Sequence, residues 1–557
     1  MPRIYVKQSD GDATQFEMNK EQNLYQGLAE KALLDAPCGG LGSCGKCRVR
    51  ILNADTAWQE TEQDFFSEEE LYEGWRLACL HAVETDLTIE LPPEEPAGDI
   101  ISSGYLREFK IEPGISKSLD SNGNTLVWAG RELAGRETGD SRNRLWGLAI
   151  DIGTTTVVAS LVDLSTAREL TSVSCLNGQK AFGQDVMSRI QYAISNNNGT
   201  VILQKTIQKD LKNLIRGAIS RCSRDLFAAE EDIYDITVAG NTTMIHLLAG
   251  INPSPLGKSP YLPSFSGPLI LKAAQDLGLP VSRHCQVYCL PAVSAFVGGD
   301  ITAGILACGI HNDPRNILFI DIGTNGEMVL SRKGQLTSCS CAAGPALEGM
   351  NISCGVRAAR GAIDEVELRG AGADIEVEYS VIGDSPPVGL CGSGLLALVA
   401  ELLRQGILHK SGRLQDHPLV EKAAGKKRFI IDQEKGLFLT QQDIRQVQLA
   451  KGAILSGIQT MVQANNLSLG EIDEILVAGQ FGAHLKAESL TGAGILPKEL
   501  ENRISYVGNT AKSGAYLCLL SCQERETAQK IAQDIGYIEL TQVPGFESLF
   551  AQAMHFD

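Results

Sequence analysis

Four cysteines near the start of the chain have a spacing that can hold an iron–sulfur cluster. Three lie close together in CGGLGSCGKC, and the fourth follows after 31 intervening residues in WRLACL. They are Cys38, Cys44, Cys47 and Cys79. A three-cysteine loop with a distant fourth cysteine is typical of 2Fe–2S ligation. The glycines of the loop, including Gly45, permit positive φ angles and a close approach of the backbone to the sulfurs.

A zinc site is the main alternative for these thiols. Zinc favours two close cysteine pairs or mixed Cys/His sets, and here only Cys44 and Cys47 form a close pair. His81 lies two residues after Cys79, and we expect a surface histidine rather than a ligand, because four thiolates already complete the cluster. The chain has 15 cysteines, an odd number that argues against a disulfide framework.

A second group of chemically capable residues lies in two strand–turn–strand repeats. WGLAIDIGTTTVVASLVDL begins at Trp146, and NILFIDIGTNGEMVLS covers residues 316–331. The shared plan indicates an internal duplication. In each turn, backbone N–H groups and hydroxyls can bind phosphate oxygens, and the aspartate can hold Mg²⁺ through water. The candidates are Asp151, Gly153, Thr154, Thr155 and Thr156 in the first copy, and Asp321, Gly323, Thr324, Asn325, Gly326 and Glu327 in the second.

These paired turns resemble the phosphate hairpins of the superfamily of actin, sugar kinases and heat-shock ATPases. The resemblance implies two RNase H-like α/β lobes with ATP between them. ILVAGQFGAHL (475–485) is similar to the adenosine motif, which places Gly479, Gln480 and Gly482 beside the adenine or ribose. The stretches 290–309 and 506–520 are similar to the two helices between the lobes, where small residues allow close crossing and hinge motion.

Several polar residues are candidates to complete the nucleotide site. DITVAGNTTMIHLLAG reads as a strand that ends at Asn241 and Thr242, and by position these two should reach the cleft from the first lobe. His246, on the apolar helix that follows, is expected to be a packed core histidine. Asp185 and Asp300 are candidates to orient an attacking water, although each can equally be a helix cap or a surface acid. Glu327 is a candidate to support Mg²⁺ indirectly.

The elements around the four cysteines follow the order of a β-grasp ferredoxin. Residues 3–7 and 14–18 alternate like the strands of a hairpin, and residues 22–34 have helical periodicity. CRVRIL and LTIELP read as two further strands. This order resembles the β-grasp 2Fe–2S ferredoxins, and the five-residue first gap between cysteines resembles the bacterial and adrenal types.

The chain is therefore expected to be an α/β multidomain protein. The expected parts are a 2Fe–2S ferredoxin-like domain at 1–91, a linker at 92–143, lobe I of an RNase H-like ATPase at 144–312 and lobe II at 313–557. The linker, which we expect to be partly structured, is rich in Pro, Gly, Ser and charge, and this composition suggests that it lets the redox domain move. A small rigid spacer domain is the alternative.

Charge and composition exclude some classes of partner. The net charge is −18, so nucleic acid, which needs a basic face, is not an expected partner. The first 95 residues contain 19 acidic and 8 basic residues. This excess gives either solubility or an acidic face for docking a redox partner. No apolar run reaches the roughly 18 residues of a membrane span, and the first residues lack a secretory signal, so we expect a cytoplasmic location without membrane contact.

The whole arrangement resembles the reductive activators of corrinoid proteins. The resemblance implies that one electron passes from the 2Fe–2S cluster to a corrinoid whose cobalt has been oxidised from Co(I) to Co(II), with consumption of ATP and Mg²⁺. The implied partners are a corrinoid protein, either a corrinoid iron–sulfur protein or the corrinoid subunit of a methyltransferase, and a low-potential electron donor. A homodimer and a setting in anaerobic methyl transfer, such as O-demethylation, are also implied.

Three other functions remain open at this stage. One is ATP-driven electron donation to another low-potential acceptor, as in the activators of 2-hydroxyacyl-CoA dehydratases, although these bridge a 4Fe–4S cluster between subunits and lack this ferredoxin domain. Another is a small-molecule kinase with a fused redox sensor, for which Asp300 is the best candidate catalytic aspartate. The third is a non-catalytic, nucleotide-gated scaffold.

Overall fold

The computed structural model describes the chain except residues 1, 8–12, 19–21, 32, 35–44, 46, 55, 93–103, 227–228, 384, 424, 480–484 and 557. Contacts divide the chain into two units. The first consists of Met1–Pro96 and Gly178–Thr206, and the second of Ala97–Asn177 and Ile207–Asp557.

A five-stranded mixed sheet forms the centre of the first unit, with strand order β2-β1-β5-β3-β4. β1 is antiparallel to β2 and parallel to β5, which is the arrangement expected of a β-grasp domain. The strands are β1 (Arg3–Lys7), β2 (Ala13–Glu17), β3 (Arg48–Ile51), β4 (Trp75–Leu77) and β5 (Leu87–Glu90). The helical elements are α1 (Leu24–Glu30), η1 (Glu60–Asp64), α2 (Glu68–Tyr72), η2 (Ala78–Leu80), η3 (Gly178–Phe182), α3 (Val186–Ser195) and the first part of α4 (Gly199–Leu226).

The local sequence explains why this sheet and its helix form. β1 buries Ile4 and Val6 and exposes the residues between them, so that one face of the strand joins the core. α1 begins at Asn23, whose side chain accepts a hydrogen bond from the backbone N–H of Gln26. Gly27 on this helix leaves room for Met18, since a Cβ there would lie 2.3 Å from the Met18 sulfur.

The second unit contains two six-stranded sheets that follow the duplicated plan. The first has the order β11-β10-β9-β12-β14-β13 and the second has the order β25-β24-β15-β16-β17-β26. The first comprises β9 (Trp146–Ile152), β10 (Thr156–Asp163), β11 (Arg168–Leu176), β12 (Ile233–Gly240), β13 (Leu269–Lys272) and β14 (Gln286–Cys289). The second comprises β15 (Asn316–Ile322), β16 (Gly326–Arg332), β17 (Gln335–Cys341), β24 (Glu474–Ala478), β25 (Ile504–Gly508) and β26 (Gly536–Tyr537).

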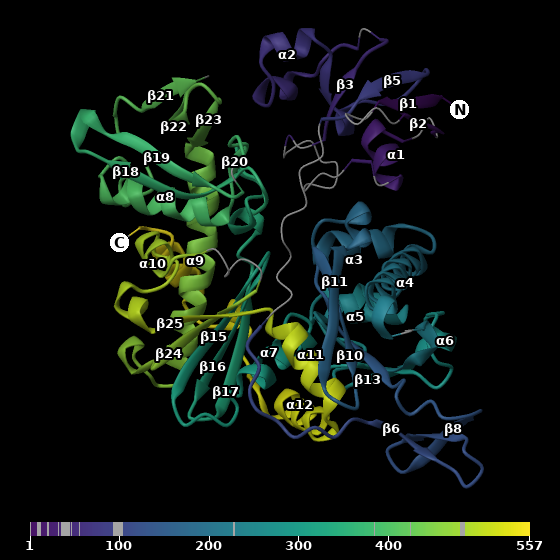
Figure 1. Cartoon of the computed structure of the whole chain (residues 1–557). Helices are drawn as coiled ribbons and strands as arrows, with labels where there is room; N and C mark the ends of the chain where they lie inside the picture. Colours follow the sequence, from purple (N-terminus) through teal and green to yellow (C-terminus); the bar gives the residue numbers. More distant parts are fainter. Residues whose placement is uncertain are drawn as a thin grey trace. The chain divides into compact units, whose positions relative to one another are not determined.

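Helices from distant parts of the chain fill the space between these two sheets (Figure 1). They are α7 (Gly299–Cys308), α11 (Thr510–Leu520) and α12 (Cys522–Asp534), and their apolar side chains form one core with residues of both sheets. α7 and α11 cross so closely that a Cβ on Gly514 would lie 2.3 Å from the Ala303 carbonyl oxygen. The two helices expected between the lobes are therefore present, with small residues at the crossing.

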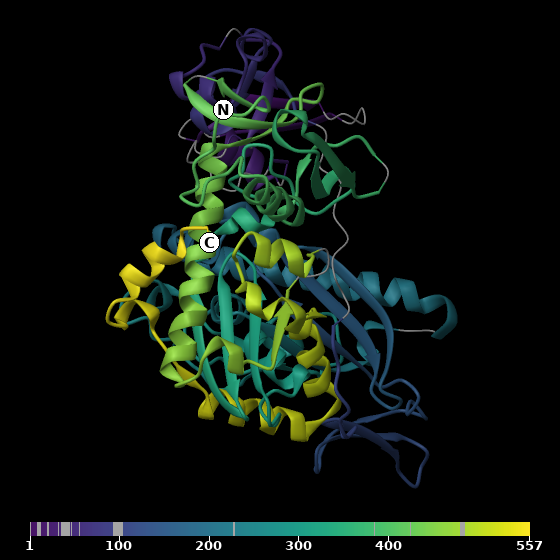
Figure 2. The ribbon, with the colours of Figure 1, turned by 90° about the vertical axis from the view of Figure 1, so that its left-hand side faces the viewer.

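The remaining elements of the second unit surround the two sheets. α9 runs along the second sheet, as Figure 2 shows. The other helices are α5 (Thr242–Ala249), α6 (Ala273–Asp276), α8 (Gly392–Arg404), α9 (Gln441–Ala464), α10 (Ala487–Gly492) and α13 (Phe546–Ala553). Two small sheets consist of β18 (Ala362–Arg369), β19 (Glu376–Val381) and β20 (Gly389–Leu390), and of β21 (Val420–Ala423), β22 (Lys426–Asp432) and β23 (Leu437–Thr440).

The stretch expected as a linker contains a small antiparallel sheet. Its strands are β6 (Ile115–Leu119), β7 (Thr125–Ala129) and β8 (Glu132–Glu137). Lys117 attaches this sheet to the first six-stranded sheet, since its buried ammonium lies 3.0 Å from the Glu137 carboxylate and 2.8 Å from the Tyr234 hydroxyl. Upstream of it, the Tyr105 N–H donates to the Val507 carbonyl at 2.8 Å. The described residues 104–143 thus pack within the second unit.

None of the helices in the described part of the chain combines the length and apolar character that a membrane span requires.

Candidate functional site

The described part of the cysteine set brings two thiols together. Cys47 directly precedes β3 and Cys79 lies in η2, and their sulfurs are 3.2 Å apart. The Ala78 N–H donates to the Cys47 carbonyl at 2.8 Å, which ties the two segments to each other. Two sulfurs on one tetrahedral metal, with bonds of about 2.3 Å, lie roughly 3.7 Å apart, so the two thiols would share one iron after moving apart by about 0.5 Å. Cys38 and Cys44 lie outside the described residues.

Gly45 illustrates the role expected of glycine in the cysteine loop. Its φ angle is +67°, in the left-handed region. A Cβ at this position would lie 2.4 Å from a ring carbon of Phe65. Both the backbone angle and the close packing therefore favour glycine here.

The expectation that His81 lies on the surface is wrong. Its side chain is only 8% exposed, and its Nε2 lies 3.1 and 3.0 Å from the two carboxylate oxygens of Glu62. Burial of the imidazole is possible because Glu62, itself fully buried, supplies a hydrogen-bond partner. A partner 19 residues away is not visible in local sequence.

The two strand–turn–strand hairpins form as the repeats predict. β9 and β10 pair in an antiparallel ladder, and so do β15 and β16. The first turn is closed by a 2.9 Å hydrogen bond from the Gly153 N–H to the Thr156 carbonyl. The second turn is one residue shorter, and the Gly323 N–H closes it with a 2.9 Å hydrogen bond to the Asn325 carbonyl. Asp321 and Glu327 are register partners, so their side chains lie on the same face of their hairpin.

Two asparagines from other elements reach the first hairpin. Asn241, at the end of β12, donates from Nδ2 to the Thr154 hydroxyl at 3.0 Å. Asn509, at the start of α11, donates from Nδ2 to the Asp151 carboxylate at 2.9 Å. The structure thus brings Asn241 to the hairpin as the sequence suggests. Thr242 points elsewhere, because its hydroxyl donates to the Ser294 carbonyl at 2.6 Å.

The second hairpin has contacts of the same kind. The Thr324 hydroxyl donates to the Glu348 carboxylate at 2.8 Å. Gly479, directly after β24, has a φ angle of +92°, and a Cβ there would lie 2.5 Å from a carboxylate oxygen of Asp321. The first glycine of the adenosine-like motif therefore packs against the second hairpin. Gln480 and Gly482 lie outside the described residues.

Four carboxyl groups of this region influence one another electrostatically. Burial, followed by repulsion from neighbouring acids, raises the pKa of Asp151 to about 7 and the pKa of Asp321 to about 7. Burial also raises the pKa of Asp300 to about 6. For Glu327, burial and then the charges of Asp300 and Asp321 raise the pKa well above its ordinary value. A bound cation would reverse this effect, because it favours the ionised form of each carboxyl group.

Asp300 lies close to both Asn241 and the acidic group. A Cβ on Gly298 would lie 2.5 Å from the Cα of Asn241 and 2.8 Å from a carboxylate oxygen of Asp300. The same Asp300 oxygen accepts a 2.9 Å hydrogen bond from the Ile301 N–H in the first turn of α7. Asp300 is therefore both a residue of the helix start and a member of the acidic group.

Asp185 has the structural role that the sequence left open. Its carboxylate accepts a 2.7 Å hydrogen bond from the Ser188 N–H and caps α3. It belongs to the first unit, whereas Asp151, Asp300 and Asp321 belong to the second. His246 is a fully buried core residue, as expected, with its Nδ1 2.7 Å from the Thr242 carbonyl oxygen.

The acidic group suits a hydrated cation better than a fully protein-bound one. Within the described ranges, no three His, Cys, Asp or Glu side chains are arranged to hold an ion by themselves. Mg²⁺ generally keeps several waters and binds through one or two carboxylates together with phosphate oxygens. Carboxylates beside two hairpin turns that present N–H groups and hydroxyls match that requirement.

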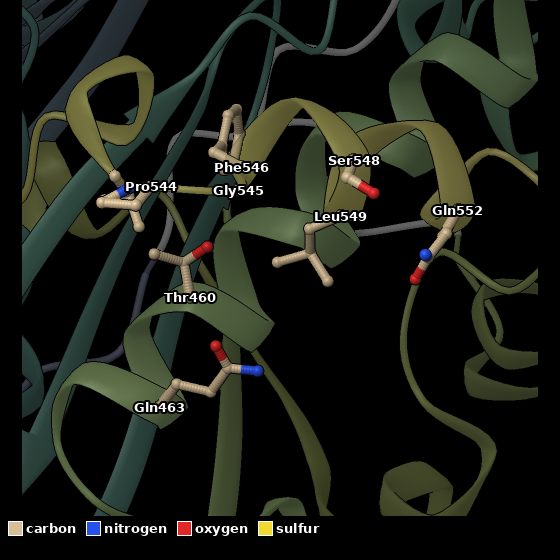
Figure 3. A pocket seen from close by; sticks show the side chains of 9 residues that line it. Thr460, Gln463, Pro544, Gly545, Phe546, Ser548, Leu549 and Gln552 are labelled. Carbon is tan, nitrogen blue, oxygen red and sulfur yellow. The ribbon is translucent and has the colours of Figure 1, made fainter.

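A pocket between α9 and the segment leading into α13 lacks such groups (Figure 3). Thr460 and Gln463 of α9 line it on one side, and Phe546, Leu549 and Gln552 line it on the other. None of its lining residues is charged. It therefore offers neither a carboxylate for a cation nor a positive charge for a triphosphate.

Sequence reasoning missed Asn509, Glu348 and Glu62. For Asn509 a signal was present, since Gly-Asn-Thr follows a strand at both Gly240–Thr242 and Gly508–Thr510. Glu348 and Glu62 act through contacts with residues distant in sequence, and nothing in their neighbourhoods marks them.

A β-grasp domain with a cysteine pair suited to iron, joined to two sheets that carry paired phosphate hairpins, defines the class of 2Fe–2S ferredoxins fused to ASKHA domains. Three family matches agree. Residues 7–84 match the 2Fe-2S iron-sulfur cluster binding domain, residues 146–313 match the RACo middle region, and residues 315–557 match the C-terminal domain of RACo, the ASKHA domain.

Two relatives and one solved structure match most of the chain. "Corrinoid activation enzyme RamQ" of Eubacterium limosum is 31% identical over 92% of this chain and 92% of its own length. "[Co(II) methylated amine-specific corrinoid protein] reductase" of Methanosarcina barkeri is 26% identical over 70% of this chain and 73% of its own length. The solved structure "Reductive activator for corrinoid,iron-sulfur protein" matches with a TM-score of 0.70 and 31% identity over 100% of this chain and 98% of that one. This chain belongs to the family of reductive activators of corrinoid proteins.

Proposed function

We propose that this protein is an ATP-dependent reductive activator of a corrinoid protein, and that it returns inactive Co(II) to Co(I) by transfer of one electron. The observation that carries the proposal is the similarity to corrinoid activators over nearly the full chain. The close Cys47–Cys79 pair and the paired hairpins supply the two kinds of site that such an activity needs.

The proposed cluster ligands are Cys38, Cys44, Cys47 and Cys79. The 3.2 Å separation of the Cys47 and Cys79 sulfurs supports this assignment for the described pair. A 2Fe–2S cluster supplies single electrons, and in plant-type ferredoxins it does so at about −400 mV. The β3–β4 ladder and the Ala78–Cys47 hydrogen bond hold the two described thiols in place.

The proposed nucleotide site uses both hairpins. In the turns Gly153–Thr156 and Gly323–Glu327, the hydroxyls and the N–H groups other than those of Gly153 and Gly323 bind the phosphates. Asp151 and Asp321 hold Mg²⁺ through water. Gly479, with Gln480 and Gly482, lies along the adenosine. Asn241 orients the first turn through Thr154, and Thr242 anchors the start of α5 behind it. Asp300, which lies beside Asn241 and acts electrostatically on Asp151 and Asp321, is the proposed group that accepts a proton from the attacking water.

Nucleotide chemistry is needed because the electron transfer is unfavourable. Each ~59 mV of uphill potential costs about 1.4 kcal/mol for one electron. When the acceptor potential lies ~120 mV below that of the donor, only about one acceptor molecule in a hundred is reduced. Conformational coupling of about 1–3 kcal/mol offsets this. The hydrogen bond from Asn509 to Asp151 connects the first hairpin to α11, a helix packed between both sheets. Nucleotide binding at the hairpin can therefore shift that helix.

The proposed partners are a corrinoid iron–sulfur protein or the corrinoid subunit of a methyltransferase, and a low-potential electron donor. We further propose a homodimer that acts in the cytoplasm, in anaerobic methyl transfer such as O-demethylation. These proposals rest on the family resemblance and on the acidic character of the first domain.

Anoxic reduction of a candidate corrinoid protein tests the function. The Co(II) to Co(I) change is followed by absorbance with ATP, with a non-hydrolysable analogue and without nucleotide. We expect conversion only with ATP. Cys79→Ser should abolish conversion and keep ATP hydrolysis, whereas Asp151→Asn should abolish hydrolysis and keep the cluster spectrum. Conversion at equal rates with and without ATP would overturn the proposal.

A further inference from the structure

Glu62 is a fully buried carboxylate in the first unit. It lies in η1 and is 0% exposed. Burial of an ionised carboxylate is costly unless hydrogen bonds compensate for the lost water. The contacts of Glu62 are therefore informative about why an acid occupies this position.

Those contacts converge on the turn that carries Cys79. The Leu77 N–H donates to Oε1 of Glu62 at 2.6 Å, just before η2 begins. The Nε2 of His81, just after η2 ends, lies 3.0 Å from Oε2 and 3.1 Å from Oε1. One carboxylate thus holds both ends of the three-residue turn Ala78–Leu80.

Glu62 is itself held by its own segment. The Gln59 N–H donates to Oε2 at 2.8 Å, and the Gln59 side chain donates to the Leu80 carbonyl at 2.7 Å. On the far side, the Leu24 N–H donates to the His81 carbonyl at 2.9 Å. The Ala78–Leu80 turn is therefore held on one side by Glu62 and on the other side by the backbone hydrogen bond between Leu24 and His81.

We propose that Glu62 is a positioning residue for the 2Fe–2S site. Its carboxylate fixes the turn that carries Cys79 and keeps a negative charge beside that turn, so that the midpoint potential of the cluster stays low. This inference rests on the proposed cluster ligation by Cys38, Cys44, Cys47 and Cys79.

The charge of Glu62 follows from the same contacts. Burial alone would raise the pKa of Glu62, but the hydrogen bonds from His81, Leu77 and Gln59 together lower it below its ordinary value. The carboxylate is therefore ionised at neutral pH. A nearby negative charge disfavours the addition of an electron, so its removal should make the cluster easier to reduce.

The test compares Glu62→Gln, Glu62→Ala and the control Glu60→Gln in the anoxically purified full chain. Glu60 lies in the same 3₁₀ helix but is exposed, so its substitution removes the same charge without disturbing a buried contact. Iron content, the visible spectrum and a spectroelectrochemical titration are measured for each protein.

We expect Glu62→Gln to retain iron, because its amide oxygen can still accept from the Leu77 N–H that precedes η2, while the amide nitrogen takes the place of the oxygen that accepted from Gln59. At a fixed solution potential, its ratio of reduced to oxidised cluster should be on the order of tenfold higher than in the wild type, the usual scale for loss of a nearby buried charge. Glu60→Gln should titrate like the wild type. Glu62→Ala should lose iron to a chelator faster than either.

An unchanged titration of Glu62→Gln overturns the proposal, as does a Glu62→Ala variant that keeps wild-type iron and spectrum. Either result leaves the proposed function standing, because the wild type still contains its cluster. A wild-type protein without a 2Fe–2S spectrum overturns both.

Discussion

Asp151 and Asp321 have pKa values of about 7, so protons and a divalent cation compete for them near neutral pH. Asp300, with a pKa of about 6, belongs to the same group. Below pH 6 these groups are protonated and bind a cation weakly. Above pH 7 they are ionised and repel one another, and a cation relieves this repulsion.

Affinity for Mg²⁺ with nucleotide should therefore rise as the pH increases from 5.5 to 8. The rise should be roughly tenfold or more, because one pKa unit corresponds to about 1.4 kcal/mol. Calorimetric titration of a non-hydrolysable ATP analogue, with and without Mg²⁺, measures it. Asp185→Asn serves as the control, since asparagine also caps a helix. Equal affinity at pH 5.5 and 8 would contradict the assignment.

The same groups predict how stability depends on pH without metal. Their pKa values are raised on folding, so their contribution is fully favourable below the unfolded value near 4 and is lost as the pH rises through about 6 to 7. The melting temperature of Mg²⁺-free protein should fall between pH 5.5 and 8. Addition of Mg²⁺ with nucleotide should raise the melting temperature most at pH 8. A melting temperature that rises over this range in Asp151→Asn and wild type alike would argue against it.

At the scale of elements, the start of α11 joins the first hairpin to the helices between the sheets. Asn509 accepts a 2.8 Å hydrogen bond from the Lys512 N–H as the helix cap and donates to Asp151 at 2.9 Å. Serine caps helices as well as asparagine does but has too short a side chain to make both bonds.

Asn509→Ser should thus fold with near wild-type stability yet shift Mg²⁺-dependent nucleotide binding to higher pH. The reason is that the Asn509 bond lowers the pKa of Asp151, and its loss leaves the effects of burial and repulsion unopposed. The pH series described for the wild type measures the shift. An identical pH midpoint in the variant would show that the bond does not tune Asp151.

The crossing of α7 and α11 predicts a contrast between two identical substitutions. Gly514→Ala places a methyl group 2.3 Å from the Ala303 carbonyl oxygen and should destabilise by about 1–3 kcal/mol. Gly217→Ala, in α4, meets nothing within 4 Å and should be neutral or stabilising by up to about 1 kcal/mol. Thermal unfolding of both variants provides the comparison, and equal effects would mean that the crossing tolerates a methyl group.

Sequence predicted the elements that depend on local pattern. The two hairpins, the ferredoxin strands and the buried His246 follow from alternation, repeated motifs and apolar surroundings. His81 was misjudged because its partner Glu62 lies 19 residues away, and Asn509 was missed because Asp151 lies 358 residues away. Tertiary packing decides which buried polar groups form hydrogen bonds with each other. The periodicity of the sequence does not reveal these pairs.

For the whole molecule, charge is distributed unevenly. The first 95 residues contain 19 acidic and 8 basic residues. If this excess docks a redox partner, the rate of reduction should fall steeply as salt rises from about 0.01 to 0.3 M, because the Debye length shrinks from ~30 Å to under ~8 Å. Stopped-flow reduction by a candidate donor measures the slope. A flat response would indicate that the acidic excess serves solubility.

The core between the two sheets has a consequence for synthesis on the ribosome. Residues as early as Ile115 share this core with residues as late as Ile535. At about 5–20 residues per second, the nascent first sheet waits tens of seconds before α11 and α12 emerge to cover it. During that interval its apolar face is exposed to water, so truncated translation products that stop before Thr510 should depend on chaperones and be prone to aggregation.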